Sequence, residues 1–87
     1  SADERRRALG LSRALHAAAA CVGDGGAAAA VVRARMAEVL DEHALQIEYA
    51  EVVDAESLEP VAEARRGNVA LIAAYCGRTR LIDNRIL

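Results

Sequence analysis

Residues 68–87 read NVALIAAYCGRTRLIDNRIL, and the rest of the chain is expected to fold around this stretch. Two runs rich in Ile, Leu, Val and Tyr, residues 69–76 and 81–87, flank a short connection that contains Gly77. This pattern predicts a β-hairpin with a loop over residues 77–80, because glycine adopts the positive φ that such loops often require. The first run is apolar at every position, so we expect it to be the central strand of a sheet. An isolated hairpin is barely stable in water, and the upstream residues are therefore expected to cover it.

A first helix is predicted from Ala2 to Val22. Ser1 and Glu4 fit the S-x-x-E capping box, which satisfies free backbone N–H groups at the start of a helix. Apolar residues then recur at spacings of three and four, which places them in one stripe along the helix: Ala8, Leu11, Leu15, Ala18 and Val22.

A second helix is predicted from Gly26 to Asp41, after a turn rich in glycine at residues 23–25. This turn does not fit a phosphate-binding loop, because no strand precedes it and no Lys-Ser/Thr pair follows it. Met36 is interpreted as a core side chain and not as a metal ligand. The inner side of the helix is expected to carry Ala28, Val32, Met36, Val39 and Leu40.

Residues 45–53, with the sequence LQIEYAEVV, predict a strand. Apolar and polar residues alternate over its first half, which is the period of a half-buried strand. Leu45, Ile47 and Tyr49 are therefore expected to face the helices. The alternation slips over residues 50–53, where we expect a bulge or the end of the strand.

An acidic connection over residues 54–67 follows, and Leu58 and Val61 are expected to anchor it. The order is helix, helix, strand, long loop, strand, strand, which predicts one α+β domain over residues 1–87. In this two-layer domain, two N-terminal helices pack on one face of a three-stranded, mainly antiparallel sheet. The other face of the sheet is expected to remain apolar and to pack on another surface through Ala70, Ile72, Ala74 and Cys76.

Composition and charge argue against several functions. The net charge is −2 with both signs interspersed, which gives no electrostatic footprint for nucleic acid. Two tyrosines, without Phe or Trp, form no platform for base stacking. No apolar run approaches the roughly 20 residues of a membrane span, and we expect no signal peptide. The sequence therefore indicates a cytoplasmic protein in which Cys21 and Cys76 are reduced.

No cluster of residues assembles an active site. Asp41, Glu42 and His43 are consecutive at a helix end, so their side chains diverge and are not expected to hold a metal ion. His16 has no partner that would make it a catalytic base. From the residues alone we predict a non-catalytic domain, with no catalytic, cofactor-binding or metal site.

The C-terminal stretch also resembles a known family. The segment TRLIDN at residues 79–84, after LIAAYCG at residues 71–77, is similar to the closing segment of pantothenate synthetase, also called pantoate–β-alanine ligase. Residues 1–15 resemble the helix that opens the C-terminal domain of this family, and the Ala-rich second helix agrees. IEYAEVVD at residues 47–54 resembles its D-Y-x-E-x-x-D strand. The resemblance covers essentially the whole chain.

The resemblance implies a role in pantothenate biosynthesis. The family joins ATP and pantoate into pantoyl adenylate, which β-alanine then attacks. Its His-x-Gly-His motif, catalytic lysine and glutamine belong to an N-terminal domain, and its Ser-Ser-Arg-Asn segment lies just before the matched region. The present chain contains no lysine and no His-x-Gly-His motif. The resemblance thus implies a C-terminal lid that is inactive alone, has the N-terminal catalytic domain as its partner, and leaves ATP and magnesium to the intact enzyme.

Thr79, Arg80, Asp83 and Asn84 are the polar residues of the matched motif, and they are our prediction for the surface that faces the missing domain. Two alternatives remain open. In the first, Arg80 and Asp83 pair with each other across the hairpin and Asn84 satisfies an edge, so that all these residues are structural. In the second, the chain is a free-standing interaction or dimerisation module that packs through its apolar sheet face.

Overall fold

The structure, a computed structural model, describes residues 1–87 and begins with the predicted helix, α1 (Ala2–Val22). The capping box forms: the backbone N–H of Glu4 donates to Ser1 Oγ at 3.2 Å, and the Glu4 carboxylate binds back to Ser1. At the other end Gly23 has a φ of 51° and its N–H donates to the carbonyl of Ala19. The predicted bounds of this helix are confirmed.

The second helix, α2 (Ala29–Glu42), begins three residues later than predicted. Residues before it are extended and form a two-residue strand, β1 (Ala27–Ala28), which pairs antiparallel with β3 (Glu63–Ala64). This pairing prevents the helix from starting at Gly26. The prediction that Ala28 faces inward is consequently wrong, and Ala29 is the buried residue.

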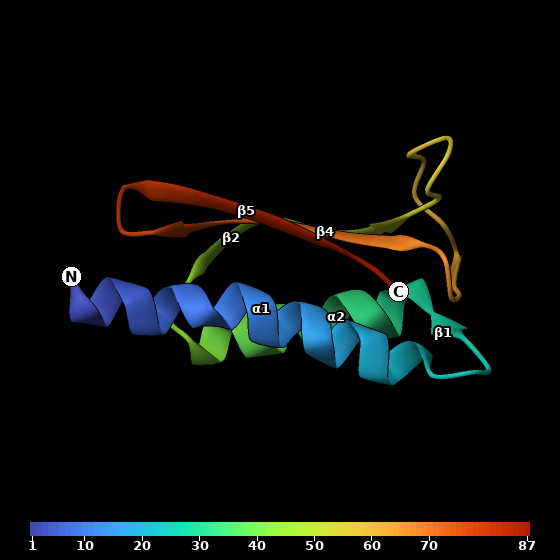
Figure 1. Ribbon diagram of the computed structural model, residues 1–87, viewed down its shortest axis with the longest axis horizontal. Coiled ribbons are helices and arrows are strands. Elements are labelled where there is room, and N and C mark those ends of the chain that lie inside the picture. Colours follow the sequence, from blue (N-terminus) through green and yellow to red (C-terminus); the bar gives the residue numbers. More distant parts are fainter.

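The main sheet contains β2 (Gln46–Val53), β4 (Val69–Cys76) and β5 (Thr79–Ile86) in the order β2-β4-β5, with all pairs antiparallel. The predicted central position of β4 is confirmed. Figure 1 shows both helices in one layer against one face of this sheet, as the predicted two-layer α+β fold requires. Neither helix combines the length and the apolar character that a membrane span requires.

The hairpin loop has two residues, Gly77 and Arg78, and not the predicted four. Only Gly77 has a positive φ, 61°, which is the pattern of a type II′ turn whose twist matches that of the flanking strands. Thr79 and Arg80 therefore belong to β5, opposite Cys76 and Tyr75.

The predicted orientation of β4 is wrong. Its alternate residues Ala70, Ile72, Ala74 and Cys76, which were expected on the uncovered face, lie in the core beneath the helices. The opposite face of β4 carries Leu71 and its alternate neighbours. Because both faces of β4 are apolar, the alternation of residues did not indicate which of them the helices cover.

The strand β2 also departs from its prediction in part. Leu45 is buried as expected, and Ile47 pairs with Ala74 on the helix side as predicted, although it is 37% exposed. Tyr49, 38% exposed, instead pairs with Ala73 on the outer face. A register shift lies between Ile47 and Tyr49, slightly earlier in the chain than the predicted slip. Beyond this bulge the alternation is inverted, so that Ala50 and Val52 contact the core.

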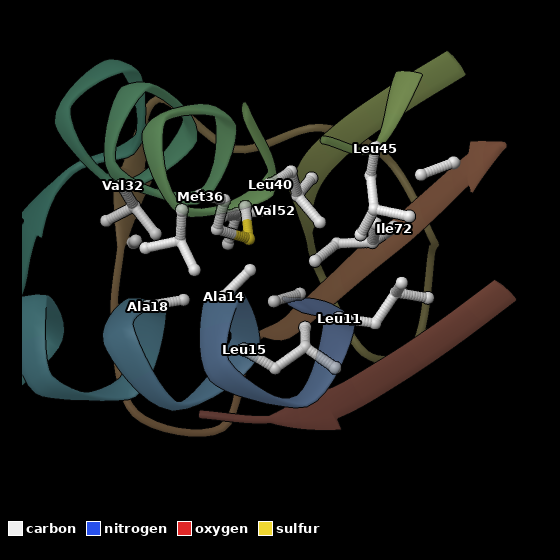
Figure 2. Packing of buried hydrophobic residues seen from close by; sticks show 14 of the residues in the cluster. Leu11, Ala14, Leu15, Ala18, Val32, Met36, Leu40, Leu45, Val52 and Ile72 are labelled. Carbon is white, nitrogen blue, oxygen red and sulfur yellow. The ribbon is translucent and has the colours of Figure 1, made fainter. Parts of the chain in front are cut away.

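The core lies between the helix layer and the inner sheet face and contains no polar or charged residue. Met36 is fully buried there, as predicted. Figure 2 shows α1 and α2 turning their apolar stripes toward each other and toward the sheet. Many of the contacts are made by alanine, which lets backbones approach closely. The helix residues that belong to this core cluster are Leu11, Ala14, Leu15, Ala18, Val22, Val32, Met36, Val39 and Leu40.

The connection over residues 54–67 is partly ordered by its own hydrogen bonds. Asp54 Oδ1 accepts the backbone N–H groups of Glu56 and Ser57, both at 2.9 Å, and these bonds hold the pKa of the Asp54 carboxyl below its usual value. Val61 packs against the core, as predicted. Leu58 is 64% exposed, so its predicted anchoring role is wrong.

Gly10 marks the closest approach of α1 to the end of α2. A Cβ added there would lie 2.7 Å from His43 Cβ and 2.8 Å from Leu45 Cδ1, which is closer than such atoms can pack. We predict that Gly10→Ala lowers the free energy of unfolding by about 1–3 kcal/mol despite the better helix propensity of alanine. Urea denaturation followed by circular dichroism measures this change.

Gly25→Ala is the matched control, because nothing lies within 4 Å of a Cβ at Gly25 and its φ is not positive. It should change the stability by no more than about 0.5 kcal/mol. Equal stability of the two variants would contradict the close packing of α1 on the end of α2.

Candidate interdomain surface

One end of the molecule gathers the start of α1, the β4–β5 loop and the start of β5 (Figure 1). Between α1 and the hairpin lies a shallow crevice of about 190 Å³. We call this part of the molecule the hairpin end. The crevice is lined by Ser1, Glu4, Arg5, Ala8, Cys76, Thr79 and Leu81.

Arg80 makes the best-defined polar contact of this surface. Its Nε donates to Glu48 Oε1 at 2.8 Å and its Nη2 donates to Glu48 Oε2 at 3.0 Å, so the ion pair is bidentate. The two residues belong to the two edge strands, and the pair therefore spans the central strand near Tyr75, which lies opposite Arg80. Glu48 reaches this position because it lies in the bulge of β2.

The ion pair shifts both of its groups. Hydrogen bonding from Arg80 lowers the pKa of the Glu48 carboxyl below its usual value of 4.5, with a smaller contribution from Tyr75. The same hydrogen bonds raise the pKa of Arg80 above its usual value. Both side chains are near 40% exposed, so salt screens their attraction. The pair therefore holds the Arg80 guanidinium in one orientation and adds little to the stability of the fold.

The four predicted interface residues do not share one face. Antiparallel partners lie on the same face of a sheet, so Arg80 and Asn84 lie on the outer face with Tyr75 and Leu71. Thr79 and Asp83 lie on the helix side. The structure thus brings Thr79 and Arg80 together at the hairpin end and places Asp83 and Asn84 farther along β5.

The alternative in which Arg80 pairs with Asp83 is wrong, because Arg80 pairs with Glu48. Asp83 Oδ1 instead accepts the backbone N–H of Asn84 at 2.8 Å. Glu48 was not among the residues predicted for this surface. An acidic residue at a break in the alternation of a strand was the available signal, but its partner is 32 positions away in the sequence.

The outer face of the sheet is partly apolar and is not covered by any other part of the chain. On β5, Ile82 is 59% exposed and Ile86 is 72% exposed. Leu71 and Val69 of β4 lie beside them and are half-buried. An uncovered apolar sheet face was predicted, but it is formed by these residues and not by the alternate set of β4.

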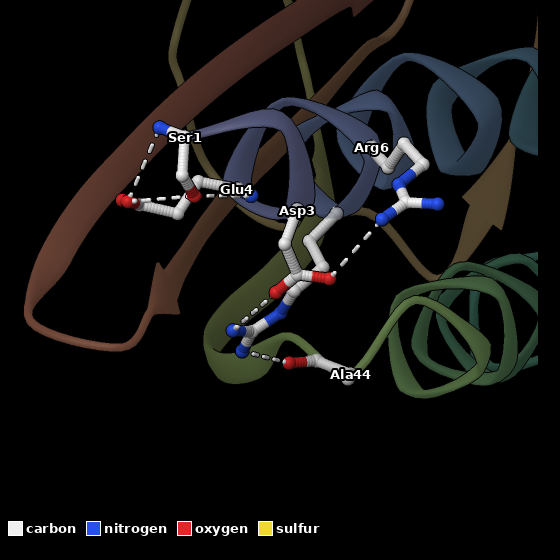
Figure 3. Close-up of polar contacts among 6 residues, drawn as sticks. Ser1, Asp3, Glu4, Arg6 and Ala44 are labelled. Atoms are coloured by element: carbon white, nitrogen blue, oxygen red, sulfur yellow. Dashed lines mark hydrogen bonds and ion pairs between the residues drawn. The ribbon is translucent and has the colours of Figure 1, made fainter.

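On the helix side, polar contacts fasten α1 to the turn between α2 and β2. Arg7 donates through Nη2 to the carbonyl of Ala44, and its Nη1 lies 3.9 Å from Asp3 Oδ2. Figure 3 shows Asp3 and Ala44 in this region. His43 Nδ1 lies 2.8 Å from the carbonyl of Val39, which it reaches as an N–H donor. These contacts orient the end of α2 and form no convergent set of metal ligands.

A groove of about 520 Å³ runs between the two helices on the side away from the sheet. It is bordered by Arg13, whose Nη1 lies 3.3 Å from His43 Nε2, and by His16. His16 makes no hydrogen bond within the chain, and Glu42 lies on the opposite wall. The side chains of the groove are mixed in charge and do not surround a common point.

The fold defines a two-layer α+β domain whose outer sheet face is uncovered and partly apolar. The family model described as pantoate-beta-alanine ligase matches residues 1–86. The chain belongs to the pantoate–β-alanine ligase family.

Individual relatives support this family assignment. The chain is 48% identical over 84 residues to the pantothenate synthetase of Anaeromyxobacter dehalogenans, covering 97% of this chain and 29% of that protein. It is 40% identical over 84 residues to the pantoate–β-alanine ligase of Arabidopsis thaliana, covering 97% of this chain and 27% of that protein. The crystal structure of pantothenate synthetase from Thermus thermophilus superposes with a TM-score of 0.87 at 30% identity, covering 99% of this chain and 31% of that one. The chain thus spans less than a third of these relatives and matches a C-terminal part of them.

The Glu48–Arg80 pair predicts a pH dependence of stability. Because the pKa of Glu48 is lower in the folded state, its contribution is complete above about pH 4.5 and is lost as the pH falls through the folded-state value. Glu48→Gln cannot ionise. The difference in free energy of unfolding between the original chain and Glu48→Gln should therefore be largest at neutral pH and should vanish in strong acid.

Denaturant titrations at a series of pH values measure this difference. Asp54, whose pKa is also lowered, is present in both proteins, so its contribution to the free energy of unfolding cancels in the difference. A difference that stays constant across the acidic range would show that Glu48 does not pair with Arg80 in its ionised form.

Proposed function

We propose that this chain is the C-terminal lid domain of a pantothenate synthetase, which condenses pantoate with β-alanine at the expense of ATP through pantoyl adenylate. The observation that carries the proposal is the match along the whole chain to relatives more than three times its length. In this view the catalytic groups, ATP and magnesium belong to the remaining part of the enzyme. The chain contributes a cover, and its own sequence includes no lysine to serve as a catalytic cation.

A lid has a definite chemical purpose in such a reaction. An acyl adenylate is activated for attack by any nucleophile, so water competes with the amine of β-alanine. Closing a domain over the site excludes water and strengthens the electrostatic interactions inside. The rigid two-layer core supports this role, because a lid must move as one body to open and close.

The hairpin end is the surface that we assign to the contact with the catalytic part. In the relatives the matched segment is a C-terminal part, so the rest of their chains precedes the position of Ser1. Ser1 lies at the hairpin end, beside Thr79 in the crevice. Arg80 is held on the same end by Glu48, with its guanidinium already oriented. Asp83 and Asn84 extend the proposed contact along β5.

We also propose a cytoplasmic location for the protein. Both of its cysteines are unpaired: Cys76 is buried in the core and Cys21 is half-buried. Reduced thiols of this kind are typical of proteins in a reducing compartment. The relatives named above are biosynthetic enzymes, which agrees with this location.

The 87-residue chain alone should not form pantothenate from pantoate, β-alanine and ATP. When it replaces the matching C-terminal segment of the Anaeromyxobacter dehalogenans enzyme, the chimera should be active, whereas that enzyme truncated before the segment should lose most of its activity. Coupled detection of AMP release together with chromatography of pantothenate measures both reactions. Turnover by the isolated chain, or a chimera no better than the truncated enzyme, would refute the proposal.

Within the chimera, Arg80→Ala should reduce kcat for pantothenate formation by about tenfold, because the oriented guanidinium is lost from the domain contact. The neighbouring Arg78→Ala is the matched control. Arg78 lies in the hairpin loop and makes no ion pair or side-chain hydrogen bond in the chain. It should retain the activity of the chimera. Equal effects of the two substitutions would remove Arg80 from the proposed contact.

A further inference from the structure

The connection between β2 and β3 carries a leucine in an unusual backbone conformation. Leu58 has a φ of 61°, in the left-handed region that residues with a Cβ adopt only at a cost. The other non-glycine residue with a positive φ, Ala44, directly follows the end of α2, where this conformation is common. The side chain of Leu58 is 64% exposed, so packing within the chain does not offset the cost. Because strained residues gather at binding and catalytic sites, Leu58 indicates a contact outside this chain.

Hydrogen bonds hold this conformation in a closed loop, residues 54–60, which we call the Leu58 loop. The N–H of Leu58 donates to the carbonyl of Asp54, and the N–H of Asp54 donates to the carbonyl of Glu59, both at 2.9 Å. The Asp54 carboxylate accepts two further N–H groups of the loop, and Ser57 Oγ accepts the N–H of Glu59 at 3.3 Å. The loop therefore presents its leucine in a fixed place, and a side chain on a backbone ordered in advance loses less entropy on binding.

The Leu58 loop projects on the outer side of the sheet. Figure 1 shows it rising above the strands, away from the helix layer and at the end of the molecule opposite the β4–β5 loop. The uncovered outer face of the sheet lies between these two ends and carries Arg80 beside the β4–β5 loop. A body that rests on the outer face therefore meets the hairpin end on one side and the Leu58 loop on the other.

The charges around Leu58 define the kind of surface that it fits. Glu56 and Glu59 lie on either side of the leucine in the sequence and are both exposed. Neither carboxylate forms an ion pair within the chain, and the loop contains no basic residue. An apolar side chain between two free carboxylates fits an apolar pocket with basic side chains at its rim, because complementary rim charges orient the approach.

We propose that the Leu58 loop is a latch that docks on the catalytic part of the enzyme, where Leu58 enters an apolar pocket rimmed by arginine or lysine side chains. The inference rests on the proposed function, which sets this chain over the catalytic part. The 84 matched residues are 29% of the Anaeromyxobacter dehalogenans protein, so about 200 of its residues lie outside the match. A globular body of this size is about 40 Å across. It can therefore reach both ends of this chain, whose long axis is 38 Å.

A contact at the Leu58 loop has a definite use in a lid. A lid held at the hairpin end alone can rotate about that contact, whereas a second contact at the opposite end prevents the rotation. Water is then excluded along the whole length of the closed domain. Without the latch, water attacks the acyl carbon of pantoyl adenylate and returns pantoate and AMP. The loss of the latch therefore releases AMP without forming pantothenate.

Hydroxyl-radical footprinting read by mass spectrometry measures the exposure of Leu58 without any substitution. In the isolated 87-residue chain Leu58 should be oxidised readily. In the chimera with the Anaeromyxobacter dehalogenans enzyme, with pantoate and ATP present to close the lid, its oxidation should fall about fivefold or more. Val31, which is 58% exposed on α2, is the reference and should react equally in both proteins.

Leu58→Asn separates the strain of the loop from its contact. Asparagine tolerates a positive φ, so the isolated variant should unfold about 2–5 °C above the original chain. In the chimera the same substitution should raise the amount of AMP released per pantothenate formed by about twofold or more, because the latch is lost. Val31→Asn is the matched control, since it removes another exposed apolar side chain, and it should leave this ratio unchanged.

The outcomes separate the latch from the proposed function. If the chimera forms pantothenate but Leu58 is oxidised as fast as in the isolated chain, the latch is overturned and the proposed function stands. A ratio of AMP to pantothenate that Leu58→Asn leaves unchanged overturns the latch as well. If the chimera forms no pantothenate, the proposed function fails, and the oxidation of Leu58 alone decides: protection supports docking of the loop, and full reactivity overturns it.

Discussion

The structure depends on which face of β4 the helices cover. This strand is apolar on both faces, yet only the set of Ala70, Ile72, Ala74 and Cys76 lies in the core. Alanine at alternate positions keeps that face flat, so α1 approaches it closely while α2 packs on β2 beside it. The choice also fixes the faces of β5, because each residue of β5 shares the face of its partner on β4. Arg80 and the exposed isoleucines lie on the outer face because the helices cover the other face of β4.

Much of the fold could be predicted because its signals are local. The capping box at Ser1 and the regular apolar stripe set the bounds of α1, and the order of helices and strands gave the two-layer architecture. The errors arose where distant segments meet. The two-residue ladder between β1 and β3 has no periodicity to detect, and it delays the start of α2. Thr79 and Arg80 were assigned to a loop because they are polar, whereas an edge strand tolerates polar residues on its exposed positions.

The candidate surface was only partly predictable for the same reason. The TRLIDN segment indicated the strand that carries the candidate surface, but the alternation of side chains along this strand divides its polar residues between the two faces of the sheet. The partner of Arg80 could not be inferred, because Glu48 reaches it through a bulge in another strand. The function, in turn, came from the similarity of residues 79–84 and the rest of the chain to a family. Nothing in the composition or charge pointed to it.

The two helices close the apolar inner face of the sheet, and the hairpin carries Arg80 and Asn84 on the outer face. Methyl NOEs test this orientation of β4 most directly. The methyl groups of Ile72 should show cross-peaks to Leu11, Met36 or Leu40 of the helix layer, and those of Leu71 should show none. Cross-peaks from Leu71 to the helices, with none from Ile72, would contradict the account, because the hairpin would then present the opposite set of residues.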